Sequence, residues 1–162
     1  MSFIDQNKKS RYQITLKQIQ SLVESEPSFR ANLCNTISLL KESFNFFWIG
    51  TYFAEGNDLV LGPFQGPPAC SRIPKGKGVC GKSWEEKKSF IVTNVDEFPG
   101  HISCNPRSKS EIVIPAKTKE GQLFMVLDID SDKQNGLDQT DLFYLEKVVS
   151  ILQGLYSKNI QF

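Results

Sequence analysis

A dense group of prolines interrupts this 162-residue chain and limits what its middle part can fold into. Each proline fixes its backbone φ angle and has no N–H to donate, so repeated prolines disfavour helix and strand alike. Four of them lie between Gly62 and Gly78: Pro63, Pro67, Pro68 and Pro74. We therefore expect this segment to be mostly loop, with the regular elements on either side of it.

Hydrophobic spacing predicts helices at both ends of the chain and strands between them. Apolar residues at helical intervals indicate a helix around Ile19 to Val23, and a second helix that Pro27 is well placed to open. Asp138 can cap a C-terminal helix. Strands are predicted at 46–53, 58–62, 90–93, 111–116 and 122–129, and a short helix at 78–86. This order predicts one α+β domain, residues 1–162, with an antiparallel sheet and helices gathered on one face.

Composition excludes several classes of protein. Lysine and arginine number 19 against 18 acidic residues, so the net charge of +1 supplies no long-range field for nucleic acid. With 40% hydrophobic residues, the chain can bury a core without disulfide staples. No apolar run approaches the roughly 20 residues that a membrane span needs. We expect a cytoplasmic protein that binds neither nucleic acid nor membrane.

The four cysteines are too few for a structural disulfide framework, so their positions are informative. Cys34 falls in an apolar helical pattern and is expected to be structural. The other three, Cys70, Cys80 and Cys104, lie within 35 residues rich in glycine, proline and serine. Accessible thiols this close together favour disulfide exchange, in which one cysteine attacks and another resolves.

Local sequence suggests how these thiols could be activated. Cys104 lies in a polar loop between His101 and Arg107, and either cation would lower the pKa of its thiol. Cys80 falls in the first turn of the short helix, where the helix dipole also favours a thiolate. Cys70 lies on a loop made rigid by prolines, where burial is hard to arrange. For Cys104 and Cys80, the alternative is a buried thiol that acts as a small hydrophobe.

A zinc site is a second interpretation of the same cysteines. With His101 they match the Cys₃His ligand set of structural zinc. Their spacing argues against it, because zinc-binding cysteines usually come in close pairs, whereas Cys70 and Cys80 are ten residues apart. A zinc-stabilised interaction module therefore stays a lesser alternative.

Three carboxylates form the next candidate group. Asp128 and Asp130 alternate at the end of an apolar and therefore central strand, so both point to one face. Their repulsion would raise one pKa and provide a proton donor near neutral pH. Glu111, at the start of the neighbouring strand, could reach the same pocket. Carboxylates that merely cap strand ends in water are the commoner outcome for such a short motif.

Two aromatic residues share a face of the first predicted strand. Trp48 and Tyr52 are four residues apart, and they could wall a pocket for an apolar ligand or a cation. Packing in the core is the alternative for both.

Taken together, these motifs resemble the GAF-domain free methionine-(R)-sulfoxide reductases. The similarity spans about residues 10–156 and is strongest in the order of three cysteines, a Ser-Glu strand and an Asp-x-Asp strand end. It is carried by the segments Trp48–Tyr52, Leu61–Gly66 with Ala69-Cys70, Gly76–Gly81, Gly100–Cys104, Ser108–Pro115 and Val126–Asp130.

This resemblance implies a GAF-like, six-stranded antiparallel sheet flanked by N- and C-terminal helices. The implied activity is reduction of free methionine (R)-S-oxide to methionine. Cys104 stands at the position of the attacking nucleophile, Cys70 at that of the principal resolving cysteine, and Cys80 at that of an accessory partner in exchange. Thioredoxin is the implied reductant, no metal or organic cofactor is implied, and homodimers are common in the family.

The resemblance also implies a substrate pocket. Glu111, Asp128 and Asp130 would hold the ammonium and the sulfoxide oxygen of the substrate, while Trp48 and Tyr52 would enclose its methyl group. Chemistry supports this set, because a sulfoxide sulfur accepts a thiolate only when its oxygen is polarised or protonated. The alternative function is a non-catalytic GAF sensor of methionine or a related metabolite.

Overall fold

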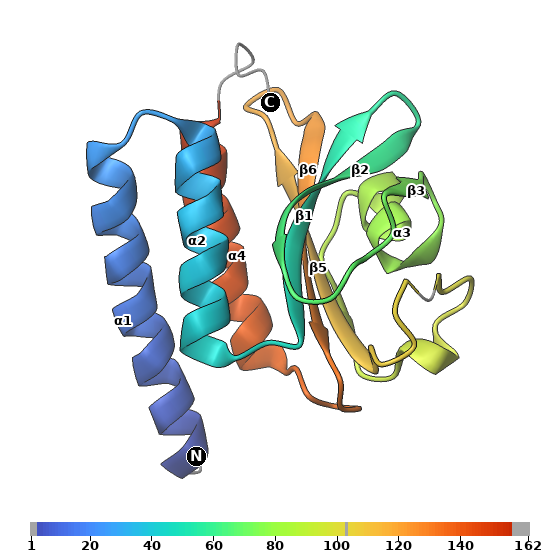
Figure 1. Ribbon diagram of the computed structural model, residues 1–162, viewed down its shortest axis with the longest axis horizontal. Coiled ribbons are helices and arrows are strands. Elements are labelled where there is room, and N and C mark those ends of the chain that lie inside the picture. Colours follow the sequence, from blue (N-terminus) through green and yellow to red (C-terminus); the bar gives the residue numbers. More distant parts are fainter. Residues whose placement is uncertain (1–2, 103, 157–162) are drawn as a thin grey trace.

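The computed structural model describes residues 3–102 and 104–156, which form helices packed around a single sheet (Figure 1). The α-helices are α1 (Phe3–Ser25), α2 (Phe29–Phe44), α3 (Gly78–Glu86) and α4 (Gln139–Leu155), and a 3₁₀ turn spans Val95–Glu97. The strands are β1 (Trp48–Glu55), β2 (Asp58–Gln65), β3 (Arg72–Pro74), β4 (Phe90–Val92), β5 (Ser110–Lys117) and β6 (Leu123–Ser131). None of the helices in these ranges has the length and apolar character that crossing a membrane requires.

Within the described ranges the strands form one antiparallel sheet in the order β3-β2-β1-β6-β5-β4. β6 pairs with β1 on one side and with β5 on the other, so the most apolar strand lies in the middle of the sheet. The prediction of a central strand from its composition is therefore confirmed.

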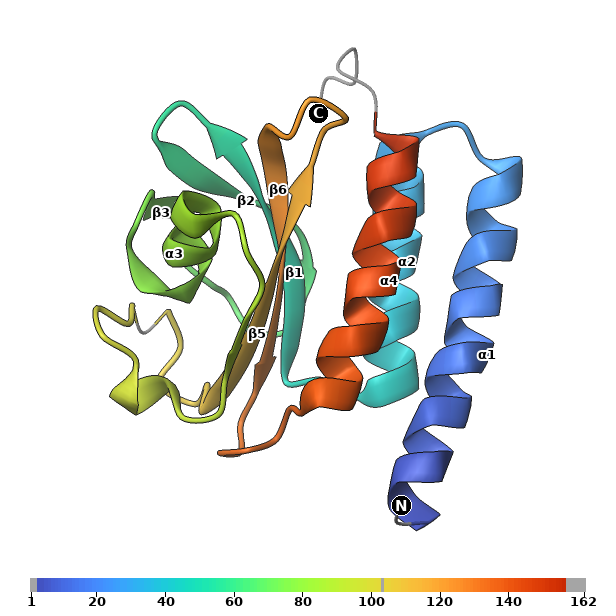
Figure 2. The same cartoon turned by 180° about the vertical axis from the view of Figure 1, so that it is seen from behind.

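The two faces of the sheet have different covers. Helices α1, α2 and α4 lie on one side, and α3 and the long loops lie on the other (Figures 1 and 2). Residues of β6 alternate between the two sides, because successive side chains of a strand point to opposite faces. Met125, Leu127 and Ile129 join the helix-side core, whereas Val126 packs under the loops. Asp128 and Asp130 share the loop side with Val126, as predicted.

The helix layer is fastened by polar contacts at its ends. Asp138 caps α4 by accepting hydrogen bonds from the backbone N–H groups of Thr140 at 2.8 Å and Asp141 at 3.1 Å, which confirms its predicted role. The carboxylate of Asp141 also accepts a 2.8 Å hydrogen bond from the buried Tyr12 hydroxyl and forms an ion pair with Lys8. These contacts connect α1 to α4. At the start of α2 the cap is Ser28, which accepts from Ala31 N at 3.3 Å. The preceding proline lies outside that helix.

The segment from Gly62 to Gly78 is mostly loop, as predicted, but it also contains two pieces of strand. β2 continues to Gln65 and so includes Pro63, and β3 forms at Arg72–Pro74. The β1–β2 register shifts between Gly50 and Tyr52, and such an irregularity accommodates a proline because it interrupts the ladder of N–H donors. β3 is an edge strand, where a proline on the outer side loses no partner. Of the four prolines, Pro67 and Pro68 lie in the loop between β2 and β3, whereas Pro63 and Pro74 lie within those strands.

Candidate active site

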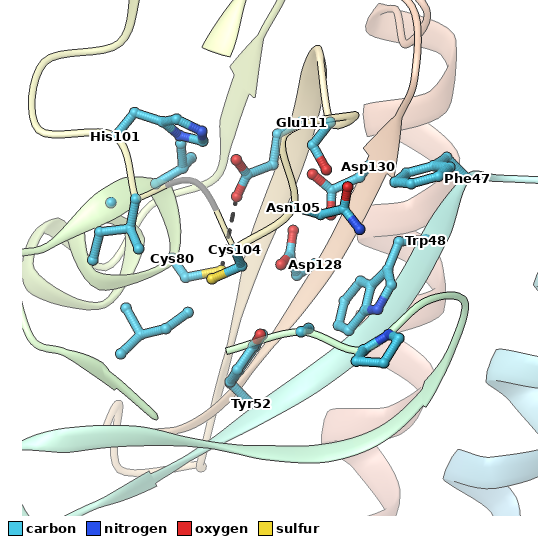
Figure 3. A pocket seen from close by; sticks show the side chains of 17 residues that line it. Phe47, Trp48, Tyr52, Cys80, His101, Cys104, Asn105, Glu111, Asp128 and Asp130 are labelled. Carbon is cyan, nitrogen blue, oxygen red and sulfur yellow. Dashed lines mark hydrogen bonds between the residues drawn. The ribbon is translucent and has the colours of Figure 1, made fainter. Parts of the chain in front are cut away.

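A cavity lies on the loop side of the sheet, between the strand surface and the loops that precede β3 and β5 (Figure 3). It encloses about 530 Å³ of free space, part of which is continuous with solvent. Seven of the eight residues singled out from the sequence line it: Trp48, Tyr52, Cys80, Cys104, Glu111, Asp128 and Asp130. The eighth, Cys70, is attached to this wall by a covalent bond to Cys104.

Strand register explains why the aromatic and acidic residues meet. In the paired strands β1, β6 and β5, Asp130 lies opposite Trp48 on one side and opposite Glu111 on the other. Residues directly opposite in an antiparallel pair have Cβ atoms about 4.5–5.5 Å apart and point to the same face. Three residues distant in sequence therefore form one row across the floor of the cavity.

A disulfide joins the two loops over this floor. Cys70 and Cys104 are bonded with a Cα–Cα distance of 5.2 Å, which is an ordinary value for a disulfide, and both are partly exposed. The pairing that the family resemblance implied is therefore present. It also means that the Cys₃His zinc set is not assembled in this state, because two of its thiols bind each other.

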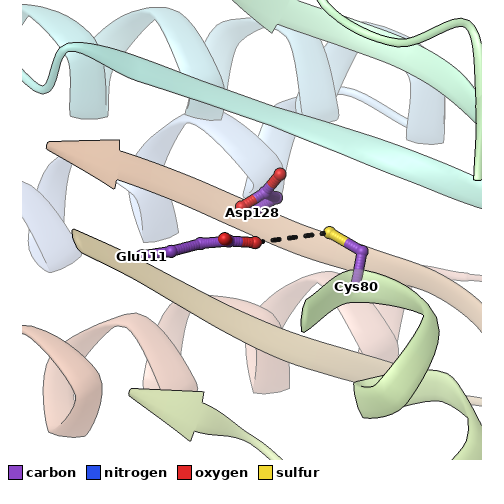
Figure 4. A group of neighbouring side chains, drawn as sticks. All are labelled: Cys80, Glu111 and Asp128. Atoms are coloured by element: carbon purple, nitrogen blue, oxygen red, sulfur yellow. Dashed lines mark hydrogen bonds between the residues drawn. The ribbon is translucent and has the colours of Figure 1, made fainter. Parts of the chain in front are cut away.

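Cys80 has a different environment from these two. It lies in the first turn of α3, is 3% exposed, and donates through Sγ to Glu111 Oε1 at 3.9 Å (Figure 4). Burial, followed by the charges of Asp128 and Glu111, raises the pKa of this thiol well above its ordinary value. The expectation that a helix N-terminus would make Cys80 a thiolate is wrong, because desolvation and nearby carboxylates outweigh the helix dipole.

The position of Cys80 depends on a close approach of α3 to β3. A Cβ atom on Gly81 would lie 2.5 Å from the carbonyl oxygen of Pro74, so only glycine permits this packing. The backbone N–H of Gly76 also donates to Gly81 O at 2.9 Å and closes the turn before the helix. These contacts hold the start of α3, and with it the thiol, against the sheet.

The three carboxyl groups share a low-dielectric site. Burial, and then the charges of Asp128 and Asp130, raise the pKa of Glu111 well above its ordinary value. Burial, and then Asp130, raise the pKa of Asp128 in the same way. Burial raises the pKa of Asp130 to about 7, although a hydrogen bond from Ser108 opposes the rise. Mutual repulsion was the predicted cause of a raised pKa in this group, whereas burial is the larger cause.

The acidic group lacks a positive partner among the described residues that perturb it. The charges that shift the pKa values of Glu111 and Asp128 all come from other acidic groups. One oxygen of Asp128, Oδ1, is also buried without a hydrogen-bond partner in the described part of the chain. An unpaired buried carboxylate oxygen is costly, so this end of the cavity is suited to a cation.

Aromatic side chains form the opposite wall. The ring centroids of Trp48 and Tyr52 are 6.1 Å apart, and the indole Nε1 of Trp48 donates to Pro67 O at 3.1 Å. That bond ties the indole to the loop that carries Cys70. Burial, and then the charge of Asp128, raise the pKa of Tyr52, so its hydroxyl stays protonated and available as a donor.

His101 and Arg107 were expected to place a positive charge beside Cys104, and neither has the surroundings predicted for it. Burial is the largest effect on His101 and lowers its pKa below 6.5, so the imidazole is neutral at pH 7. The guanidinium of Arg107 lies over the ring of Phe47, at 4.8 Å from its centroid, and 3.9 Å from Asp132. The expectation for Cys34 is also wrong, because this cysteine is exposed on α2.

Sequence reasoning missed some residues that line the cavity. Ser108 is 8% exposed and hydrogen-bonds Asp130, and Phe47, Ile102 and Asn105 contribute to the wall. Ser108 begins a segment that carried the family resemblance, and its position three residues before Glu111 was a usable signal. Ile102 likewise lies in a segment that carried the resemblance, Gly100–Cys104. Phe47 and Asn105 had no such signal, because their contribution depends on how the chain around them folds.

Comparison with known proteins agrees with this geometry. The GAF domain family model matches residues 31–153. GAF domain-containing protein A of Dictyostelium discoideum is 50% identical over 149 residues, covering 91% of this chain and 94% of that protein. Free methionine-R-sulfoxide reductase of Escherichia coli is 41% identical over 153 residues, covering 89% and 92%.

A solved structure gives the same result. The X-ray structure of free methionine-R-sulfoxide reductase from Neisseria meningitidis, in complex with its substrate, superposes with a TM-score of 0.88 at 44% identity. The match covers 91% of this chain and 89% of that one. The chain therefore belongs to the GAF-domain family of free methionine-(R)-sulfoxide reductases and is an enzyme of that family.

Proposed function

We propose that this enzyme reduces free methionine (R)-S-oxide to methionine by a cysteine-based mechanism. The observation that carries the proposal is the Cys70–Cys104 disulfide beside a cavity that holds three buried carboxyl groups. A redox-active pair and a cluster of proton donors are the two components that sulfoxide reduction by a thiol needs. Their proximity supports this reaction over the sensing of a ligand, for which the disulfide would have no use.

The first step is attack of the Cys104 thiolate on the sulfoxide sulfur. The sulfoxide oxygen is transferred to Cys104 together with a proton, so that methionine leaves and the cysteine becomes a sulfenic acid. The sulfur of the substrate is reduced by two electrons and that of Cys104 is oxidised by two. No metal or organic cofactor takes part in this balance.

The carboxyl groups supply both charge and protons. Substrate ammonium binds beside Asp128 Oδ1, which has no hydrogen-bond partner within residues 3–102 and 104–156, and none of the charges in these ranges that shift the pKa of Asp128 is positive. A neighbouring carboxyl with a raised pKa stays protonated near neutral pH and donates to the sulfoxide oxygen. Glu111, Asp128 and Asp130 together thus bind the substrate ammonium and donate a proton to the sulfoxide oxygen.

The aromatic wall selects the other end of the substrate. Trp48 and Tyr52 present flat apolar surfaces 6.1 Å apart, on which a thioether methyl group can pack. A free amino acid brings an ammonium to the acidic end, whereas a methionine within a peptide has none to offer. Selectivity for the free amino acid follows from this difference.

Cys70 resolves the intermediate. Its thiol attacks the sulfenic acid of Cys104, water leaves, and the disulfide seen in the structure forms. Thioredoxin then reduces this bond by dithiol exchange, for which the partial exposure of both cysteines is suitable. The need for thioredoxin also argues for a cytoplasmic protein, and we propose a single catalytic domain that can form homodimers.

The decisive experiment is a thioredoxin-coupled assay with three substrates. Free methionine (R)-S-oxide should be reduced, and free (S)-S-oxide and a peptide with an internal methionine (R)-S-oxide should not. Equal rates with the free and peptide-bound (R)-S-oxides would contradict the proposed role of the carboxylates. Binding of free methionine without turnover of any sulfoxide would instead support a sensor.

A further inference from the structure

Three side chains at the acidic end of the cavity converge from different elements. Cys80 comes from α3, Glu111 from β5 and Asp128 from β6, and all three point toward one another (Figure 4). One donor atom of each lies within 4.8 Å of the other two. The exposed fractions are 3% for Cys80 and 6% for each carboxylate, so the group is held by packed structure rather than by surface loops.

We propose that Cys80, Glu111 and Asp128 form an inhibitory zinc site, in which one thiolate and two carboxylates bind Zn²⁺ at the end of the cavity that otherwise receives the substrate ammonium. This set differs from the Cys₃His set of the sequence analysis and shares only Cys80 with it. It does not require Cys70 or Cys104, which are bonded to each other. The inhibitory consequence rests on the proposed function, whereas binding of the ion does not.

Distances at the site fit the bond lengths of zinc. Zn–S and Zn–O bonds are about 2.3 Å and 2.0–2.2 Å, so two ligand atoms of a tetrahedral zinc ion lie about 3.4–3.7 Å apart. Cys80 Sγ and Glu111 Oε1 are 3.9 Å apart, slightly more than this spacing. The remaining pair distances are at most 4.8 Å and can close by side-chain rotation.

Charge supports a divalent ion at this place. The acidic groups have no cationic partner among the described residues that perturb them, and Asp128 Oδ1 is buried without a hydrogen bond. The missing hydrogen bond at this oxygen is independent of the clustering of the three side chains. Its residue, Asp128, is only 6% exposed. Bound Zn²⁺ would displace to solvent the proton of the Cys80 thiol and the protons that the raised pKa values keep on Glu111 and Asp128, and its two positive charges would offset two of the three negative charges on the ligands.

The ligand types select zinc over harder cations. Calcium and magnesium prefer sites built entirely from oxygen, whereas zinc binds thiolate and carboxylate together. Three protein ligands leave a fourth position open, and all three ligands line the cavity. An ion held there takes up the carboxylates that the substrate needs, so zinc and methionine sulfoxide should compete.

The first test measures metal binding alone, on the protein with its disulfide intact. Only Cys34 and Cys80 are then free thiols. One equivalent of Zn²⁺ should bind in a chelator-competition titration, and Co²⁺ should give a thiolate-to-metal absorption band. Cys80→Ser should abolish the band and weaken Zn²⁺ at least tenfold, because ligand loss costs at least as much as the 10–100-fold typical of outer-shell changes. Cys34→Ser, which alters the exposed thiol, should change neither.

A second pair of variants keeps the test valid if Cys80→Ser does not fold. Asp128→Asn and Glu111→Gln retain side-chain size, and thermal melting verifies that they fold. Each should weaken Zn²⁺ by a similar factor. Unchanged affinity in these folded variants, or loss of the cobalt band in Cys34→Ser instead of Cys80→Ser, would overturn the site.

The final test addresses inhibition. In a Cys70→Ser/Cys104→Ser background, free methionine sulfoxide can bind without being reduced. The apparent Kd of Zn²⁺ should then rise linearly with the concentration of the sulfoxide. An unchanged Kd would overturn the overlap of the two sites. The thioredoxin-coupled assay tests the proposed function separately from the metal site. If no sulfoxide is turned over, the proposed function fails, but the metal titration still shows whether Zn²⁺ binds.

Discussion

Asp130 lies directly opposite Glu111 in the ladder of β5 and β6, on the face of the sheet that bears the cavity. Two residues earlier in β6, Asp128 projects to the same face. A β-sheet normally avoids opposing like charges, since they destabilise the pair. Here the cost is reduced because buried carboxyl groups retain protons, and the same arrangement provides acids that remain protonated near neutral pH.

Stability should therefore fall as the pH rises. The pKa of Asp130 is about 7 in the folded chain against an ordinary value of 3.8, so the folded state holds a proton that the unfolded state has lost. The stabilising contribution is fully present below pH 3.8 and is lost progressively as the pH rises from 3.8 through about 7. The wild type should therefore lose stability between pH 5 and pH 8, and Asp130→Asn should make that loss smaller by on the order of 2–3 kcal/mol.

The measurement is denaturant unfolding of the two proteins at both pH values. Asp132→Asn is the matched control, because Asp132 is in the same segment but its side chain is 45% exposed. This control should keep the pH dependence of the wild type. A wild-type dependence in Asp130→Asn would show that Asp130 does not carry the buried proton.

Removal of a carboxyl should slow the chemical step. Asp128→Asn and Asp130→Asn each remove a group that can hold the ammonium or donate a proton, so the single-turnover rate should fall by tens to hundreds of times. In the wild type the rate should fall at high pH, because the carboxyl that must donate a proton ionises above about 7. Rapid-quench measurement of methionine release tests this, and unchanged rates in both variants would refute the role of the carboxylates.

Sequence patterns predicted the acidic floor of the site for a clear reason. Alternation in a strand is a local rule, so Asp128 and Asp130 had to share a face once 122–129 was recognised as a strand. Recognition of an adjacent strand beginning near Glu111 then brought the third carboxyl to the same edge. The observed β6 differs from the prediction by only one or two residues at each end.

Protonation states could not be predicted in the same way. The sequence predicts that Cys80 lies in the first turn of a helix and shows that His101 precedes Cys104, but it does not show how deeply either is buried. Desolvation is the largest effect on both, and it keeps the first as a thiol and the second as a neutral imidazole. The continuation of the predicted strand 58–62 through Pro63 was missed for a related reason, because the irregular register that accommodates the proline is a property of the pair β1–β2.

Substitution of Cys104 should abolish turnover. Cys104 lines the cavity whereas Cys70 does not, so Cys104 is the thiol that can contact a bound sulfoxide. Cys104→Ser should reduce methionine formation to the level without enzyme, in the thioredoxin-coupled assay and in single turnover. Cys34→Ser is the control and should retain the wild-type rate, because Cys34 is exposed on α2, on the far side of the sheet. Near wild-type turnover by Cys104→Ser would reject it as the nucleophile.

Substitution of Cys70 should separate the chemical step from recycling. Without its thiol, the sulfenic acid of Cys104 loses the partner to which it is bonded in the structure, at a Cα–Cα distance of 5.2 Å. Cys70→Ser should still release one methionine per active site, but multiple turnover with thioredoxin should be lost. Mass spectrometry should detect an oxygen atom retained on Cys104. Normal multiple turnover would mean that another group resolves the intermediate.

The shape of the aromatic wall depends on a glycine in β1. A Cβ atom on Gly50 would lie 2.4 Å from the indole of Trp48 and 2.5 Å from Cβ of Phe64, so Gly50→Ala must displace the ring. We expect KM for free methionine (R)-S-oxide to rise several-fold and unfolding free energy to fall by about 1–3 kcal/mol, as for overpacked sites. Gly154→Ala is the matched control. Its Cβ would meet nothing within 4 Å in α4, so this variant should gain up to about 1 kcal/mol and keep its KM. Steady-state kinetics and denaturant unfolding of both variants test the prediction, and an unchanged KM in Gly50→Ala would mean that the position of the indole does not determine substrate binding.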